Sequence, residues 1–73
     1  MRIRVQIDDA RKTIHLDVES TDTIHIVKAK IQAEEDIPTG QQFLFLPHKR
    51  LHDSFTLAGY YIQNESTVYL AHW

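Results

Sequence analysis

The period of the apolar residues changes twice along this chain, and that change limits its fold more than any other feature. Residues 1–7 alternate strictly between apolar and polar side chains, and the alternation resumes from Lys12 to Val18. A period of two is typical of strands with one buried face. The polar residues 8–11 between the two runs favour a turn, although they contain no glycine. The first quarter of the chain therefore predicts an antiparallel hairpin.

The spacing then becomes helical. Ile24, Val27 and Ile31 lie at positions i, i+3 and i+7, and Thr23 before them is a residue type that caps helices. Pro38 cannot continue a helix and restricts the residue before it, so the helix is expected to end near Glu35. Its remaining side chains are expected mostly on the solvent side: Lys28, Lys30, Gln32, Glu34 and Glu35. Asp36 stands where a left-handed residue normally ends a helix.

The second half of the chain contains shorter elements. Residues 43–46 predict a third strand with Leu44 and Leu46 inward, residues 47–50 a turn, and Leu51 the start of a brief fourth strand. Residues 56–60 predict one helical turn, and residues 67–72 a last strand with Val68 and Leu70 inward. Without a linker or a repeat, residues 1–73 are expected to form a single α+β domain, a mixed sheet of four to five strands packed on one long helix.

The composition excludes several classes of function. The chain has no cysteine, so disulfides and thiolate chemistry are absent. Lys and Arg number 8 against 10 for Asp and Glu, and a net charge of -2 argues against nucleic acid or an anionic membrane as the main partner. No apolar run approaches the roughly 20 residues of a membrane-spanning helix. A cytoplasmic or nuclear location and a monomeric state are expected.

No catalytic or metal-binding pattern is present either. Ser20, Asp22 and the five histidines are scattered among turns and strand faces, with no motif that pairs a nucleophile with a base. His48 and His52 are four residues apart but straddle a turn, so they favour surface positions over a zinc site. The two glycines are too few for a phosphate-binding loop. We expect no enzyme activity, no catalytic residue, no metal and no cofactor.

Many residues resemble those of ubiquitin-family domains at matching offsets over essentially the whole chain. The matching positions are Asp22-Thr23-Ile24, Val27 to Gln32, Ile37-Pro38, Gln41-Gln42, Leu44, Lys49, Leu51, Asp53, Thr56-Leu57, Tyr60, Ile62-Gln63, Glu65 to Thr67 and Leu70. A full-length match is far more specific than a short motif. The resemblance implies the ubiquitin-like β-grasp fold, a right-handed crossover between parallel first and third strands, and a Tyr60 hydroxyl that fastens a tight turn to the backbone near His52.

The resemblance also implies a binding surface on the outward side of the sheet, where strands one, five and three would lie side by side. In the family this surface is an aliphatic patch with basic flanks that receives helical and zinc-finger receptors. The predicted protein-binding patch here consists of Phe43, Phe45, His48, Lys49, Tyr69 and Ala71, with Arg4, Gln6 and Arg50 nearby. Exposed aromatic residues are enriched at binding hot spots, although aromatic side chains also pair across strands simply to shield a sheet.

Two departures predict altered or weakened receptor recognition. The Asp8-Asp9 pair replaces an apolar residue of the first hairpin loop, and the bulk of Phe45 is expected to obstruct a receptor helix. Four lysines match positions that accept chains in the family: Lys12, Lys28, Lys30 and Lys49. Solvated charge explains these four equally well.

Three interpretations of the chain remain open. The first is a non-enzymatic ubiquitin-like module that binds ubiquitin-receptor-like or proteasomal proteins. The second is a modifier truncated before its tail, because Leu70-Ala71-His72-Trp73 lacks the double glycine needed for conjugation. The third is a designed ubiquitin-fold protein without a cellular role, which the spared core, the dispersed surface changes and the unusual Pro47 would fit.

Overall fold

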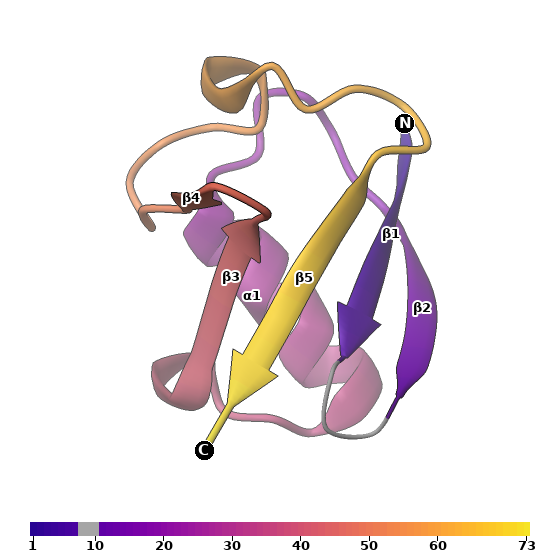
Figure 1. Cartoon of the computed structure of the whole chain (residues 1–73), viewed down its shortest axis with the longest axis vertical. Helices are drawn as coiled ribbons and strands as arrows, with labels where there is room; N and C mark the ends of the chain where they lie inside the picture. The colour runs from indigo at the N-terminus through magenta and orange to yellow at the C-terminus, as the bar shows by residue number, and fades with distance from the viewer. Residues whose placement is uncertain (8–10) are drawn as a thin grey trace.

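A computed structural model describes residues 1–7 and 11–73, which form one sheet with a helix across one side (Figure 1). The sheet order is β2-β1-β5-β3-β4. In chain order, the elements are β1 (Arg2–Ile7), β2 (Lys12–Asp17), α1 (Ile24–Glu35), the 3-10 turn η1 (Thr39–Gln41), β3 (Gln42–Leu46), β4 (Lys49–Arg50), the 3-10 turn η2 (Ala58–Tyr60) and β5 (Thr67–His72). The ubiquitin-like β-grasp and the predicted order of strands and helices are confirmed, and the sheet has five strands.

One prediction about strand direction is wrong. The parallel partner of β1 is β5, while β3 runs antiparallel to β5 and therefore also to β1. The arrows of β1 and β5 point one way in Figure 1, and that of β3 points the other. The long connection from β4 to β5 carries the chain back across the molecule, so β5 enters between β1 and β3 in the direction of β1.

The helix-facing side of the sheet carries the hydrophobic core. Because side chains alternate along a strand, every second residue of each strand points toward α1, and the helix covers it. The core members are Ile3, Val5, Ile7, Leu16, Val18, Ile24, Val27, Ile31, Leu44, Leu51, Leu57, Ile62, Val68 and Leu70. Met1, Ile14 and Leu46, also predicted inward, are partly buried against it.

Both ends of α1 are capped as the sequence predicts. The Thr23 hydroxyl accepts a hydrogen bond from the Ile26 N–H at 3.2 Å. Asp36 adopts the left-handed conformation (φ 59°), and its N–H donates to the Gln32 carbonyl. The N–H groups of Ile24 and His25 donate to carbonyls of residues 55 and 53. The helix start is thereby tied to the segment between β4 and η2.

The prediction that Lys28 lies on the solvent side of the helix is wrong. Its side chain is 10% exposed, and its ammonium lies 2.6 Å from the Asp53 carboxylate. A buried ammonium needs such a partner because losing its water is costly. Asp53 comes from the segment that also caps the helix start, so this ion pair is available only in the assembled fold.

The predicted start of the fourth strand at Leu51 is also wrong. β4 consists of Lys49 and Arg50, and Leu46 pairs with Lys49, which leaves Pro47 and His48 as the turn. Neither turn residue has a positive φ. Two-residue hairpins favour turns with positive φ, because other turns splay the strands. A splayed hairpin accounts for a β4 of only two residues.

The Tyr60 expectation is confirmed, since its hydroxyl accepts a hydrogen bond from the His52 N–H at 2.7 Å. The predicted turn over residues 8–11, including Asp8 and Asp9, lies outside the described residues except for Arg11. Within the described ranges, no helix has the length and apolar character to cross a membrane.

Candidate functional site: an aromatic sheet face

The outward side of β3 and β5 gathers four residues that we call the sheet face: Phe43, Phe45, Tyr69 and Ala71. The strand register places Phe43 opposite Ala71 and Phe45 opposite Tyr69. The rings of Phe45 and Tyr69 stack with centroids 5.8 Å apart, and Phe43 meets Phe45 edge-on at 5.9 Å. The three aromatic residues are half-buried, and Ala71 is exposed. The sequence therefore predicted this grouping correctly.

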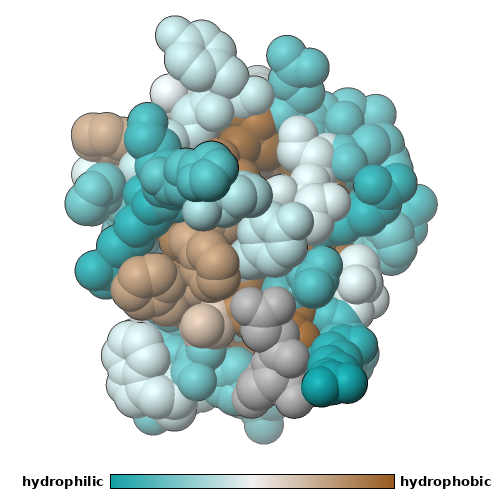
Figure 2. All heavy atoms as spheres, viewed as in Figure 1, coloured by the Kyte–Doolittle hydropathy of each residue, from teal (hydrophilic) through white to brown (hydrophobic). Residues whose placement is uncertain are grey.

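Figure 2 shows this side of the molecule as a small apolar area over β3 bordered by hydrophilic side chains. On β1, the charge of Arg4 is balanced, because its guanidinium lies 3.1 Å from the Glu65 carboxylate. At β4, neither Lys49 nor Arg50 forms an ion pair within residues 1–7 and 11–73. Two adjacent unbalanced cations therefore lie at the β4 border of the sheet face.

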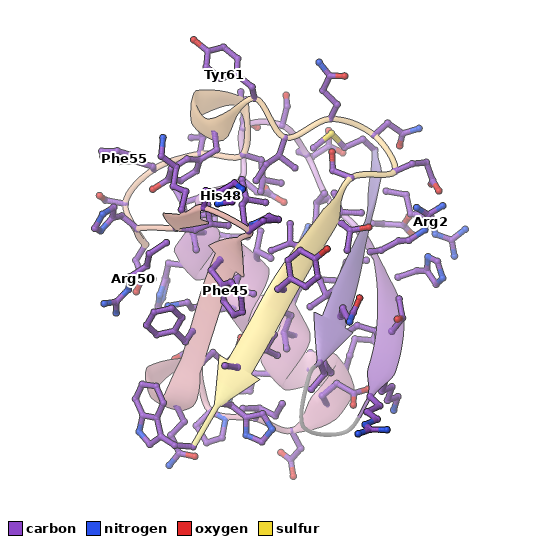
Figure 3. All side chains as sticks on the ribbon, viewed as in Figure 1. Arg2, Phe45, His48, Arg50, Phe55 and Tyr61 are labelled. Carbon is purple, nitrogen blue, oxygen red and sulfur yellow. The ribbon has the colours of Figure 1, made fainter. Side chains whose placement is uncertain are left out.

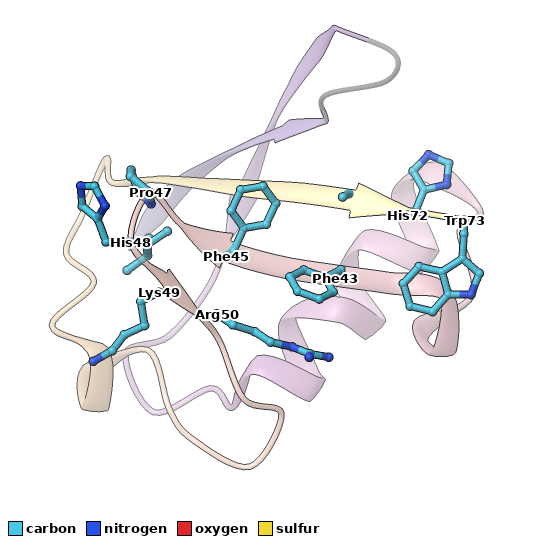
Figure 4. A pocket seen from close by; sticks show the side chains of 10 residues that line it. Phe43, Phe45, Pro47, His48, Lys49, Arg50, His72 and Trp73 are labelled. Atoms are coloured by element: carbon cyan, nitrogen blue, oxygen red, sulfur yellow. The ribbon is translucent and has the colours of Figure 1, made fainter.

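A shallow hollow of about 530 Å³ opens beside the sheet face (Figure 4). None of the described residues that line it is acidic: Phe43, Phe45, Leu46, Pro47, His48, Lys49, Arg50, Ala71, His72 and Trp73. The Arg50 guanidinium lies 4.2 Å from the centre of the Phe43 ring, a cation–π contact. The hollow therefore combines aromatic surface with unbalanced positive charge.

Trp73 is a member of this surface that the sequence prediction missed. The residue is 70% exposed and lines the hollow, and its backbone N–H donates to the Gln41 carbonyl. Tyr69, Ala71 and Trp73 share one parity, so the period-two pattern extended past residue 72 would have indicated it.

A second aromatic group lies beyond β4, and the sequence prediction missed it as well. We call His52, Phe55 and Tyr60 the turn cluster. Its ring centroids are 5.9 Å apart from His52 to Phe55 and 5.7 Å apart from Phe55 to Tyr60. The Lys49 ammonium lies 5.6 Å from the centre of the Tyr60 ring. The available signal was two aromatic residues, Phe55 in a predicted loop and Tyr60 in the predicted helical turn.

The other predicted lysines occupy different environments. Lys12 is exposed and bonds the Glu35 carboxylate at 3.1 Å, whereas Lys28 is the buried residue described above. Lys30 bonds the Asp22 carboxylate at 2.8 Å and the Asp17 carbonyl at 3.1 Å. The hydrogen bond from Lys30, together with that from the Glu19 N–H, lowers the pKa of Asp22 below its ordinary value. These contacts hold β2, α1 and their connection together.

The described residues contain no group of three His, Asp or Glu side chains arranged to hold a metal ion. Four of the histidines, His15, His25, His48 and His52, are exposed.

Comparison with known proteins agrees with the fold. The model of the ubiquitin family matches residues 2–72. The ubiquitin-like protein NEDD8 of Dictyostelium discoideum is 32% identical over 59 residues, which cover 81% of this chain and 77% of that protein. The NEDD8-like protein RUB3 of Arabidopsis thaliana is 34% identical over 59 residues, which cover 81% of this chain and 76% of that protein.

Proposed function

Because the chain belongs to the ubiquitin family, we propose that it is a non-enzymatic module that binds other proteins through the sheet face. The observation that carries the proposal is the half-exposed stack of Phe43, Phe45 and Tyr69 beside a hollow of about 530 Å³. Aromatic side chains that lie near a pocket and are rimmed by polar groups are typical binding hot spots. If the aromatic side chains only shielded the sheet from water, the adjoining hollow would not be required.

The proposed partners are proteins of the ubiquitin-receptor or proteasomal kind, met by a monomer in the cytoplasm or nucleus. Nucleic acid and membrane are not proposed partners, because the net charge is -2. Recognition of ordinary receptor helices is expected to be altered or weakened, since the bulky Phe45 ring lies over the middle of β3 and β5, as Figure 3 shows.

A chemical-shift titration of the isotope-labelled protein with a ubiquitin-interacting helix tests the proposal. We expect shifts at Phe43, Phe45, Tyr69 and Ala71. Phe45→Ala should raise the affinity for this helix, because it removes the ring that is expected to obstruct it. Its matched control is Ile26→Ala, because Ile26 is an exposed apolar residue on α1, on the other side of the sheet. A titration that perturbs none of the four residues would contradict the proposal.

A second candidate function, a conjugatable modifier, is favoured by the two relatives, which are named NEDD8 and NEDD8-like. Lys12, Lys30 and Lys49 are then the accessible candidates for chain attachment, and burial makes Lys28 the poorest. Incubation of the protein's full coding product with the activating enzyme of NEDD8 tests this function. A thioester-linked product would support it, and the absence of any adduct would contradict it.

A further inference from the structure

We propose that the partner segment bound at the sheet face is acidic and crosses β4, so that it also contacts the turn cluster of His52, Phe55 and Tyr60. This inference rests on the proposed function and specifies the chemistry and path of the partner. A segment confined to the sheet face and its hollow would leave the turn cluster in water.

The charges around β4 are the first observation, and they indicate that the partner is acidic. Lys49 and Arg50 are consecutive and exposed, and within the described part of the chain neither has a carboxylate partner. By contrast, Arg4, Lys12 and Lys28 are each paired with a carboxylate. Complementary charge directs partners to a surface and fixes their register. Two adjacent unbalanced cations at the border of a binding face therefore fit carboxylates on the partner.

The path across β4 follows from the directions of these two side chains. Figure 4 shows Arg50 extending toward Phe43 and Lys49 extending away from it. Arg50 lies against Phe43 at 4.2 Å and Lys49 against Tyr60 at 5.6 Å, so each cation of this two-residue strand rests on a different aromatic group. The sheet face, the two cations and the turn cluster thus form one continuous band.

The third observation is the exposure of aromatic side chains at the end of the band near η2. Phe55 is 53% exposed and Tyr61 is 88% exposed, and both lie at the η2 end of the molecule in Figure 3. Tyr61 has a left-handed backbone (φ 57°), which is unfavourable for a residue with a bulky side chain. Phe55 contacts the Tyr60 ring over which the Lys49 ammonium lies, so this end of the band offers apolar contact and positive charge to the same acidic segment.

The observations favour a protein segment over the other anionic macromolecule, single-stranded nucleic acid. Phosphate-backbone binding depends on many cations, and the band offers Lys49 and Arg50 on a chain of net charge -2. An oligonucleotide is nevertheless a necessary arm of the test.

Three probes test the inference by titration of the isotope-labelled protein: a peptide alternating glutamate with leucine and phenylalanine, the same peptide with lysine for glutamate, and oligouridine. We expect the glutamate peptide alone to bind, to shift signals of both the sheet face and the turn cluster, and to weaken as salt increases. Absence of binding by the glutamate peptide, or equal binding of the lysine peptide or of oligouridine, would overturn the inference. Shifts confined to the sheet face would overturn it while leaving the proposed function standing.

Variants separate the two ends of the band. Lys49→Glu and Arg50→Glu should each weaken the glutamate peptide about tenfold. The matched control Arg2→Glu, at the opposite edge of the molecule in Figure 3, should not. Phe55→Ser should weaken this peptide comparably but leave the ubiquitin-interacting helix unaffected. If Phe45→Ala weakens the peptide and Phe55→Ser does not, the crossing of β4 is wrong and binding at the sheet face remains.

Discussion

The two sides of the sheet differ in the type of their apolar residues and in how deeply these residues are buried. On the helix side, residues such as Leu44 and Leu70 are aliphatic and fully enclosed. On the other side, Phe43, Phe45 and Tyr69 are aromatic, half-exposed and bordered by cations. Aliphatic residues pack to the density that a small core needs, whereas rings retain contact area that a partner can cover. The helix side therefore stabilises the fold, and the other side is the one that we propose for binding.

The largest expected effect separates two neighbours on β5. Leu70→Ala should cost about 2–5 kcal/mol of unfolding free energy, because it leaves a cavity in the core. Tyr69→Ala should cost only about 1 kcal/mol, mainly the stack on Phe45. Urea denaturation of both variants measures the contrast. Equal losses would break the distinction between the two sides.

A smaller effect is expected at Gln42, a buried polar residue on the helix side. Its side-chain amide donates to the carbonyls of Lys28 and Ile37, while its own oxygen has no partner among the described residues. Gln42→Leu should cost about 1–3 kcal/mol by removing those two hydrogen bonds. Gln41→Leu, at an exposed neighbour, is the control for urea denaturation. A more stable Gln42→Leu protein would mean that the unpaired oxygen outweighs both bonds.

The Lys28–Asp53 pair tests how firmly the helix is attached to the segment after β4. Asp53→Asn should cost about 1–2 kcal/mol, toward the lower end for a charged hydrogen bond because the Asp53 side chain is 54% exposed. The measurement is thermal or urea unfolding, with Glu34→Gln as an exposed control. Combining Asp53→Asn with Lys28→Met should recover part of the loss. A double variant no more stable than Asp53→Asn would argue against a cost from the unpaired ammonium.

Asp36 offers a gain in stability outside the sheet. Asp36→Gly should raise the unfolding free energy by about 0.5–1 kcal/mol, because glycine adopts a φ of 59° without strain. Glu34→Gly, within the helix, should lower it by a similar amount. Parallel urea titrations compare the two. A loss of stability in Asp36→Gly would show that the aspartate side chain contributes more than the strain costs.

The smallest expected effect is a pH dependence from Asp22. Its pKa is lowered mainly by the hydrogen bond from Lys30, so its contribution is fully present above the unfolded value of about 3.9. That contribution is lost as pH falls through the lower folded pKa. Asp22→Asn should therefore reduce the loss of unfolding free energy that the wild type shows as pH falls. Identical acid limbs for the wild type and Asp22→Asn would contradict the assignment.

Much of the fold could be predicted because its signals are local. Period-two alternation identified the strands and their inward residues, and Thr23, Asp36 and Pro38 bounded the helix. Lys28 was misplaced because its burial depends on Asp53, twenty-five positions away and brought close only by folding. The length of β4 depends on the splay of the turn at Pro47 and His48, which alternation does not encode.

The candidate site divides in the same way. Parity along β3 and β5 predicted Phe43, Phe45, Tyr69 and Ala71, and the register confirms that they meet. It could not predict the turn cluster, because Phe55 and Tyr60 lie in irregular segments without a period. Nor could it predict that Lys49 and Arg50 rest on different aromatic groups.

The sequence by itself determined most of the elements and the inward apolar residues of the strands and the helix, since period and capping chemistry act between residues close in the chain; its full-length resemblance indicated the family. The tertiary structure alone decided that β5 is the parallel partner of β1, that Lys28 is buried, and that β4 joins two aromatic groups. These features depend on contacts between distant segments. Their free energy arises only when the long connection after β4 closes and brings those segments together.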